Sequence, residues 1–310
     1  MGELRFDGKA AIVTGSGRGL GRGYAQLLAA RGCRVLVNDP GVATSGRAQD
    51  EGAADVVAAE ITDAGGDAIA DRHSVLDGAD AIVTHAMDEF GRVDIVVNNA
   101  GISGGGAFDE MPTEDFDRIF STHFGGAVAV SRAAWPHLKA SGNGRVVNMS
   151  SASVFGTPFT SPYVTGKAGI FGLTRALAAE GAFSGINVNA VMPAAYTRMT
   201  AQLPDDVFRT FLETYFPPDK VAPFVVFLAH ESTTISGETF SVGADRAARV
   251  FLAECRGVVG DGSPEAFVDR VDDLMSLEGW GLPADMMDEV RYSAEQLGPE
   301  VVAAYAKVAR

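Results

Sequence analysis

The residues best suited to chemistry in this sequence are a tyrosine and a lysine four positions apart, Tyr163 and Lys167. This spacing places both side chains on one face of a helix. A tyrosine phenol has an ordinary pKa of about 10, and a neighbouring ammonium group favours its phenolate form. Tyr163 is therefore a candidate general acid or base, with Lys167 as its electrostatic helper. Taken alone, the motif leaves open a second interpretation, an exposed pair on an amphipathic helix.

A glycine-rich segment near the N-terminus has the composition of a phosphate-binding turn. Residues 14–21 read TGSGRGLG, the pattern T-G-x-x-x-G-x-G, formed by Gly15, Gly19, Leu20 and Gly21. Glycines let the backbone turn tightly and approach a pyrophosphate, and the following helix offers free N–H groups at its positive end. The pattern predicts a dinucleotide site, and an ordinary glycine-rich turn is the alternative.

An acidic residue, Asp39, closes the second apolar run. A carboxylate at this position accepts hydrogen bonds from the adenosine ribose hydroxyls and repels a 2′-phosphate, which favours NAD. Arg18 is the opposing signal, because a basic residue in the glycine-rich segment can favour NADP. We expect NAD, since Asp39 lies nearer to the ribose. A turn cap before Pro40 is the alternative interpretation of Asp39.

Asn99, Ala100 and Gly101 follow the fourth apolar run directly. Small residues permit the close approach of a ligand, and an Asn side chain can hold loop backbone in place. We therefore place these three residues in the cofactor site, although the segment alone is also typical of a turn.

Short apolar runs alternate with longer helical patterns along most of the chain. The runs are continuously apolar, as are strands covered on both faces of a parallel sheet. Their alternation with helices indicates right-handed βαβ units. The expected fold class is α/β, a doubly wound parallel sheet with a helical C-terminal extension. We expect strands at 9–14, 33–38, 67–71, 93–97, 144–149, 186–191 and 239–242, and helices at 20–31, 78–90, 113–140 and 161–182, with one more ending near 65.

Composition excludes several classes of protein. The chain has 310 residues, of which 46% are hydrophobic, and this share excludes a disordered protein. Its net charge of −15 argues against the basic face that nucleic-acid binding requires. The two cysteines, Cys33 and Cys255, have no disulfide or metal-site spacing, and we expect no metal. No secretory signal and no apolar run of roughly 18 residues is evident, so we expect a cytoplasmic protein that does not span a membrane.

The glycine pattern, N-N-A-G, a serine ending the fifth strand and Y-x-x-x-K occur in one chain and in this order. On these motifs the sequence resembles the short-chain dehydrogenase/reductase superfamily over residues 7–245. The resemblance implies a Rossmann-like fold, NAD(P)-dependent oxidation or reduction, and a catalytic group of Ser, Tyr and Lys with Asn as a fourth member. It also implies that Tyr163 and Lys167 contact the cofactor.

The catalytic serine is Ser150 or Ser151. The family's usual spacing of 13 to the tyrosine selects Ser150. The family generally uses the second serine of such a pair, however, and a deletion of one residue after Ala152 explains a spacing of 12. We therefore choose Ser151, whose hydroxyl would bond the substrate oxygen.

Two positions depart from the family pattern. His123 stands where the fourth catalytic member, Asn, is expected, and it could anchor a water and titrate near neutrality, or simply pack in its helix. His73 stands where an Asp usually meets the adenine amino group, so we expect this contact to rely on Val75 and backbone. Further along the chain, the resemblance places Pro193 against the cofactor and Thr197 on the nicotinamide carboxamide. Residues 194–218, rich in aromatic side chains, are a candidate lid.

Residues 37–61, 198–200 and 221–232, together with His123, narrow the resemblance. They resemble the (3R)-hydroxyacyl-CoA dehydrogenase units of peroxisomal D-bifunctional (multifunctional type 2) enzymes, also described as 17β-hydroxysteroid dehydrogenases. This implies NAD-dependent oxidation of a (3R)-3-hydroxyacyl-CoA to the 3-ketoacyl-CoA, with a separate enoyl-CoA hydratase as a pathway partner. A steroid ring alcohol is the alternative substrate, because an acidic chain is an awkward host for the CoA phosphates. A catalytically silent NAD-binding scaffold is the alternative of another class.

The motifs end near residue 245, and residues 246–310 remain. Ser263-Pro264-Glu265 marks a helix start, and amphipathic pieces follow at 266–277, 284–297 and 299–308. We expect a helical extension rather than an independent domain, packed on the sheet domain or on a partner subunit and walling the active site. The resemblance implies a homodimer or homotetramer built on the helices at 113–140 and 161–182.

Overall fold

The computed structural model describes residues 2–43, 45–46, 52–202, 205–261 and 263–308. The chain divides into two compact units, unit 1 (Met1–Arg249) and unit 2 (Val250–Arg310), which are described separately.

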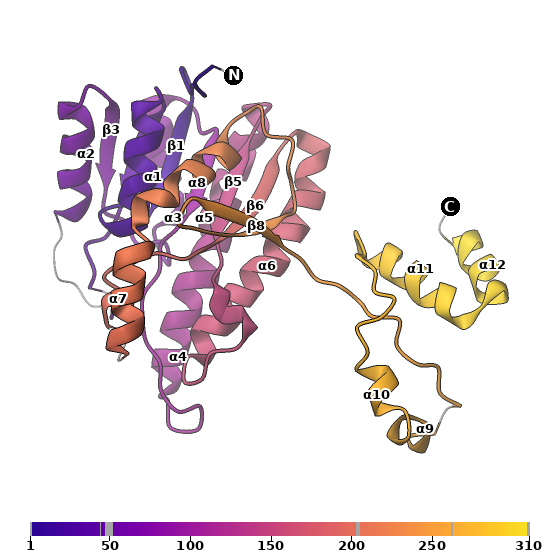
Figure 1. Cartoon of the computed structure of the whole chain (residues 1–310). Coiled ribbons are helices and arrows are strands. Elements are labelled where there is room, and N and C mark those ends of the chain that lie inside the picture. Colours follow the sequence, from indigo (N-terminus) through magenta and orange to yellow (C-terminus); the bar gives the residue numbers. More distant parts are fainter. Residues whose placement is uncertain (1, 44, 47–51, 203–204, 262, 309–310) are drawn as a thin grey trace. The chain divides into compact units, whose positions relative to one another are not determined.

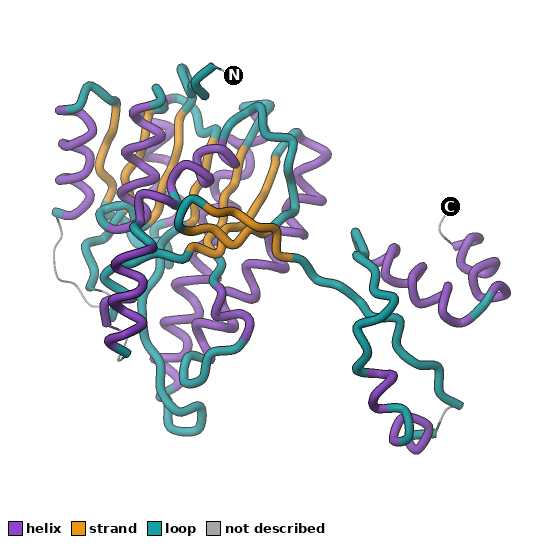
Figure 2. Tube along the Cα trace, in the orientation of Figure 1, coloured by secondary structure: helices purple, strands orange, loops and turns teal. Residues whose placement is uncertain are grey.

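Unit 1 is built on one sheet with the strand order β3-β2-β1-β4-β5-β6-β7-β8 (Figures 1 and 2). Every printed register from β3 to β7 is parallel, as the continuously apolar runs predicted. The strands are β1 (Ala10–Thr14), β2 (Arg34–Asn38), β3 (Asp67–Asp71), β4 (Ile95–Asn98), β5 (Arg145–Met149), β6 (Asn187–Pro193), β7 (Thr239–Gly243) and β8 (Arg246–Val250).

Successive residues of each strand point to opposite sides of the sheet, and because both sides are apolar, helices cover both faces. Val13 and Val35 belong to a core that includes Leu28 of α1, whereas Ile12 and Leu36 belong to a second core beneath α3 and α5. The doubly wound α/β fold is therefore confirmed. The helices of unit 1 are α1 (Gly19–Ala30), α2 (Ala53–Asp63), α3 (Ala79–Phe90), α4 (Thr113–Phe120), α5 (Gly126–Ala140), α6 (Ser161–Gly181), α7 (Asp206–Tyr215) and α8 (Ala222–Ala229).

Short helical turns occur between these elements. The predicted helix 113–140 is interrupted by a π-helical turn, η1 (Ser121–Gly125), between α4 and α5. Such turns insert a residue into the helix and are frequent at functional sites. The other turns are the 3₁₀ segments η2 (Ala152–Phe155), η3 (Ala182–Ser184), η4 (Thr200–Gln202) and η5 (Pro218–Lys220).

The sheet continues beyond the last strand that the sequence indicated. Ala244 and Asp245 both have positive φ, the conformation of a tight two-residue hairpin, and they lead from β7 into β8. Unit 1 therefore extends to Arg249, four residues past the boundary expected at 245.

Unit 2 contains four helices in its described part, at positions close to the predicted amphipathic pieces. Asp285 caps α11 by accepting a hydrogen bond from the backbone N–H of Asp288, and an isolated bridge pairs Glu254 with Gly281. The helices are α9 (Glu265–Val268), α10 (Val271–Leu274), α11 (Met286–Leu297) and α12 (Pro299–Val308). In the described parts of both units, no helix is long and apolar enough to cross a membrane.

Candidate active site

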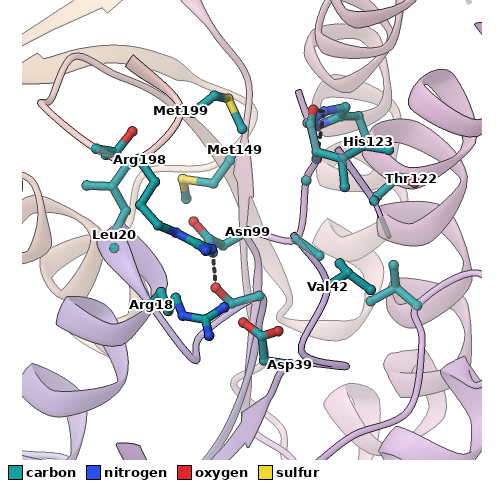
Figure 3. Close-up of a pocket in the computed structure, with 18 of the residues that line it drawn as sticks. Arg18, Leu20, Asp39, Val42, Asn99, Thr122, His123, Met149, Arg198 and Met199 are labelled. Atoms are coloured by element: carbon teal, nitrogen blue, oxygen red, sulfur yellow. Dashed lines mark hydrogen bonds between the residues drawn. The ribbon is translucent and has the colours of Figure 1, made fainter. Parts of the chain in front are cut away.

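A cavity of about 370 Å³ opens at the carboxyl ends of β1, β2, β4, β5 and β6 (Figure 3). Ligands of doubly wound sheets bind at this edge, where the strand order reverses. Most of the residues predicted from the sequence line it: Gly15, Gly19, Leu20, Asp39, Val75, Asn99, Ala100, Gly101, His123, Tyr163, Lys167, Pro193 and Thr197. Gly21 and Ser151 are not among the lining residues.

Two glycines of the glycine-rich turn have no room for a side chain. A Cβ on Gly15, whose φ is +63°, would lie 2.8 Å from the Ala100 Cα, and one on Gly21 would lie 2.4 Å from the Gly15 oxygen. The Asn99 amide donates to the backbone oxygens of Thr14 (3.0 Å) and Gly15 (2.9 Å). The Asn99 segment therefore holds the glycine-rich turn in place beside the cavity, as its sequence suggested.

The lining of the cavity suits an anionic ligand. The first turn of α1 contains no acidic residue, so its free N–H groups and positive dipole end are uncompensated. Among the described lining residues, Arg18, Arg118, Lys167 and Arg198 are basic and Asp39 is the only carboxylate. In an otherwise acidic chain, this local excess of positive charge fits the phosphates of a dinucleotide.

Asp39 is nearly buried and closes the turn after β2. Its carboxylate accepts hydrogen bonds from the backbone N–H groups of Gly17 (3.0 Å) and Gly41 (2.8 Å). Asp39 is thus a turn cap, the alternative that the sequence left open. A carboxylate has about four acceptor sites, so the capped side chain can still accept a ribose hydroxyl. Its contact with the cofactor stays a prediction.

Tyr163 and Lys167 lie on one face of α6, and both are shielded from water. The Lys167 Nζ donates to the Met149 backbone oxygen at 2.6 Å and lies 5.8 Å from the centroid of the Tyr163 ring. Burial lowers the pKa of Lys167 to about 7. Burial also raises the pKa of the Tyr163 phenol, against the lowering effect of a side-chain hydrogen bond with Ser151. In the protein alone the net shift of the Tyr163 pKa is upward, because burial outweighs the hydrogen bond with Ser151.

The two candidate serines have different partners. The Ser150 hydroxyl is buried and donates to the Lys167 backbone oxygen at 2.8 Å. The Ser151 hydroxyl accepts from the Ser153 N–H at 3.1 Å and hydrogen-bonds the Tyr163 phenol. Ser150 borders the cavity, but its proton is committed to backbone. The contact with Tyr163 therefore favours Ser151, whose catalytic role stays a prediction.

His123 lies in the π-helical turn, with its ring edge-on to the Tyr163 ring at 4.8 Å between centroids. Its Nε2 donates to the Ile102 backbone oxygen at 2.7 Å, and its buried Nδ1 has no hydrogen-bond partner among the described residues. Burial, and secondarily the charge of Lys167, lower the pKa of His123 to about 3. The titration near neutrality that the sequence suggested is therefore wrong, because the imidazole stays neutral well below pH 6.

His73 is not among the residues that line the cavity. Its Nδ1 lies 2.9 Å from the buried Asp71 carboxylate, which His85 also contacts at 2.9 Å. Val75 and the neighbouring Ser74 line the cavity, and the expected contact of Val75 with adenine stays a prediction. The Asp71 cluster was not foreseen, because the sequence does not show that the end of β3 and the middle of α3 bring His73 and His85 to one buried carboxylate.

The loop after β6 is folded back on itself by the Thr200 hydroxyl. Thr200 accepts from the Thr197 N–H at 2.7 Å, and its own hydroxyl proton reaches the Ala195 oxygen at 3.2 Å. Of the predicted lid, Met199 lines the cavity and Leu212 is buried, whereas Phe208 and Phe211 are about half exposed. Leu203, another lid candidate, lies outside the described residues.

Two arginines that line the cavity, Arg118 and Arg198, were not predicted as site residues from the sequence. Arg118 donates to the Ser45 backbone oxygen and to Asp115, and it joins α4 to the loop after β2. Arg198 directly follows the predicted Thr197 and extends into the cavity beside Asn99 (Figure 3). Its place after a predicted cofactor residue was the only available signal.

Comparisons with known proteins agree with this geometry. A family model for short chain dehydrogenases matches residues 9–207. The peroxisomal multifunctional enzyme type 2 of Mus musculus is 44% identical over 243 residues, covering 78% of this chain and 32% of that protein. This chain thus spans about a third of that relative's length.

Two solved structures are similar over most of the chain. The full-length peroxisomal multifunctional enzyme type 2 from Drosophila melanogaster has a TM-score of 0.77 and 29% identity, covering 97% of this chain and 50% of that one. A 7α-hydroxysteroid dehydrogenase complexed with NADH and 7-oxo glycochenodeoxycholic acid has a TM-score of 0.70 and 28% identity, covering 79% of this chain and 97% of that one.

Proposed function

The chain belongs to the short-chain dehydrogenase family, and on this premise we propose that it oxidises a (3R)-3-hydroxyacyl-CoA to the 3-ketoacyl-CoA with NAD. The observation that carries the chemistry is the meeting of Tyr163, Lys167 and Ser151 beside a cavity suited to a dinucleotide. The identity of the substrate is supported by the similarity to multifunctional enzyme type 2, of which this chain covers only a part.

The chain's own residues divide the work of the reaction. Tyr163 takes the proton of the substrate hydroxyl as the carbon–oxygen double bond forms. Ser151 donates a hydrogen bond to the substrate oxygen, and Lys167 holds a positive charge near the phenolate. A bound NAD would supply the hydride acceptor for the carbinol carbon, and the positive charge of its nicotinamide ring before the transfer would favour the phenolate. The neutral His123 offers its Nδ1 as an acceptor for a water that relays the proton outward.

NAD rather than NADP is supported by the position of Asp39. Its carboxylate borders the cavity and would face a 2′-phosphate with a like charge. The similar 7α-hydroxysteroid dehydrogenase is described with NADH, which agrees with this choice.

Two alternatives remain testable. A steroid alcohol is favoured by the similarity to the same hydroxysteroid dehydrogenase, whose complex contains a 7-oxo bile-acid derivative. A silent NAD-binding scaffold is the alternative of another class, and the intact Tyr163–Lys167 pair weighs against it.

The partners and location follow as further proposals. We keep the expected homodimer or homotetramer and a separate enoyl-CoA hydratase in the same pathway. The cytoplasmic location also stays a prediction, while the mouse relative is named peroxisomal.

The deciding experiment replaces the phenol by a phenyl group. Tyr163→Phe should lower kcat/KM with (3R)-3-hydroxyacyl-CoA and NAD by about a thousandfold or more, since the variant lacks the phenol that takes the proton. Tyr24→Phe is the matched control, because the Tyr24 hydroxyl is buried and donates to the Met149 sulfur at 3.6 Å, and Tyr24 is not among the residues that line the cavity. Absorbance at 340 nm follows NADH formation.

The same assay separates the alternatives. Wild type is compared on racemic 3-hydroxyacyl-CoA and on 7α- and 17β-hydroxysteroids, each with NAD and NADP. Preference for a steroid would replace the acyl-CoA proposal. Binding of NAD without turnover of any of these substrates would support the scaffold, and an unchanged Tyr163→Phe would contradict the mechanism.

A further inference from the structure

Asp71 is a buried carboxylate that the proposed reaction does not use. It ends β3, an edge strand of the sheet (Figure 1), and is only 2% exposed. Its Oδ2 lies 2.9 Å from the Nδ1 of His73 and 2.9 Å from the Nδ1 of His85. Its Oδ1 accepts from the Asn38 amide at 2.7 Å and from the His73 backbone N–H at 3.1 Å. The Asp71 cluster thus joins side chains from β2, from the turn after β3 and from α3.

The charge of Asp71 sets the direction of these bonds. Burial raises the pKa of the Asp71 carboxyl, but the hydrogen bonds from both histidines and Asn38 outweigh burial, and the net shift is downward. An ionised carboxylate only accepts hydrogen bonds, so each imidazole presents a hydrogen on Nδ1. A neutral imidazole can carry its hydrogen there, and a protonated one always does. The cluster therefore keeps its bonds whether or not the histidines are protonated.

The charged side chains of the surrounding elements leave these bonds in place. Arg72 points to α2, where it donates to Asp55 at 2.9 Å. On α3, Asp88 and Glu89 lie one turn after His85 and are exposed, so water screens their effect on the imidazole. The groups that titrate in direct contact with the buried carboxylate are thus the two histidines.

The Asp71 cluster lies between two segments that line the cavity. On one side, the Asp71 backbone oxygen accepts from the N–H of Asp39, the first residue of a lining segment, at 2.9 Å. On the other side, His73 directly precedes the lining residues 74–76. Asn38 joins the two sides, since its amide also donates to the His73 backbone oxygen at 2.8 Å. A change at the cluster therefore moves both walls of this end of the cavity.

We propose that Asp71 is a positioning residue for the dinucleotide, which sets the distance between the two lining segments through the Nδ1–H groups of His73 and His85. Asp71 is not among the residues that line the cavity, so it acts through these segments and touches no ligand. The inference rests on the proposed dinucleotide cavity, in which Asp39 marks the adenosine end. Adenosine binding then depends on the direction of the hydrogen bonds at Asp71 and not on the protonation of the histidines.

The test reverses these bonds without changing the shape of the side chain. In Asp71→Asn the amide nitrogen takes the place of Oδ2, because both partners of Oδ1 are donors. At pH 8 this amide can donate to the Nδ1 of two neutral imidazoles, so the variant should bind ADP-ribose nearly as well as wild type. At pH 5.5, below the ordinary histidine pKa of about 6.5, imidazolium N–H groups face the amide N–H groups, and we expect about a tenfold or greater loss of affinity.

Calorimetric titration at the two pH values measures these affinities. The wild-type affinity for ADP-ribose should change by less than about threefold, because the charge on partly exposed imidazoles is screened. Nicotinamide mononucleotide, which lacks the adenosine, should bind Asp71→Asn and wild type equally at both pH values. In turnover at pH 5.5, Asp71→Asn should raise the KM for NAD relative to wild type and leave kcat unchanged.

Variants of His85 test the same bond from its other end. The His85 side chain is partly exposed, so its replacement leaves the fold intact. His85→Leu removes the donor and should weaken ADP-ribose binding at pH 8 by about threefold to tenfold. His85→Asn supplies an amide N–H in place of the imidazole N–H and should restore part of this loss. His137→Leu, in α5 and outside the cavity lining, is the matched control and should change nothing.

Two results would overturn the positioning role of Asp71. One is the same pH dependence of ADP-ribose affinity in wild type and Asp71→Asn. The other is an equal loss for ADP-ribose and nicotinamide mononucleotide, which would indicate a general loss of structure. A wild type that binds neither NAD nor ADP-ribose would instead contradict the proposed function.

Discussion

Unit 1 and unit 2 differ in how they bury apolar side chains. Unit 1 encloses large residues completely, among them Tyr24, Leu28 and Ile12. In the described part of unit 2, Ala294 is the only buried hydrophobic residue, while Leu277 is 79% exposed and Met286 73% exposed. Burial of apolar area is the main favourable term in folding. Unit 1 therefore carries its own stability, whereas unit 2 needs a surface to cover its apolar residues.

The difference in burial between the two units is tested first by replacing one leucine with alanine in each unit. Leu28→Ala in α1 should lower the free energy of unfolding by about 3 kcal/mol or more, because it leaves a cavity in a closed core. Leu274→Ala in α10, where the side chain is 44% exposed, should change it by less than about 0.5 kcal/mol. Urea denaturation measures both. A comparable loss for Leu274→Ala would mean that unit 2 is covered as thoroughly as unit 1.

The contrast also marks how much of the molecule the sequence could predict. Val13, Ile12 and their neighbours form continuous apolar runs, and such runs specify buried parallel strands through local pattern alone. The amphipathic helices of unit 2 were equally visible. The sequence did not predict which surface covers these helices, because the pattern of one segment does not identify the surface against which it packs.

Within the site, the predictable part was again local. The glycine-rich turn and the Tyr163–Lys167 pair follow from short spacings. The neutral state of His123 was hidden, because it depends on burial beneath Gly101 and the nearby Lys167. Arg198 was missed for a related reason: its loop is folded by the hydrogen bond from the Thr197 N–H to the Thr200 hydroxyl, which the sequence does not show.

Removing unit 2 tests what its exposed apolar residues do. A chain ending at Arg249 should keep a cooperative unfolding transition, because the two cores of the sheet remain complete. If residues 250–310 wall the active site, as the sequence suggested, kcat/KM for the acyl-CoA should fall about tenfold or more, equivalent to about 1.4 kcal/mol.

The affinity of the shortened chain for ADP-ribose provides the control, because the described lining of the cavity belongs to unit 1. It should stay unchanged. A soluble, fully active chain without unit 2 would show that the extension has no part in the site, and analytical ultracentrifugation of both forms would show whether it joins subunits.

The smallest expected effect comes from one lysine in each unit. Burial lowers the pKa of Lys167 to about 7 from its ordinary value of 10.5. Between these pH values the unfolded chain binds a proton that the folded chain does not, so the free energy of unfolding rises with pH in this window. From pH 7 to 8 the contribution of Lys167 is about 1 kcal/mol. Lys167→Met should remove that rise, and Lys307→Met, at an exposed site in α12, should keep it. Urea denaturation at the two pH values gives both slopes. Equal slopes in wild type and Lys167→Met would show that burial does not lower the pKa of Lys167. Unit 1 would then be less closed around Tyr163 and Lys167 than the contact of Lys167 at 2.6 Å with Met149 indicates.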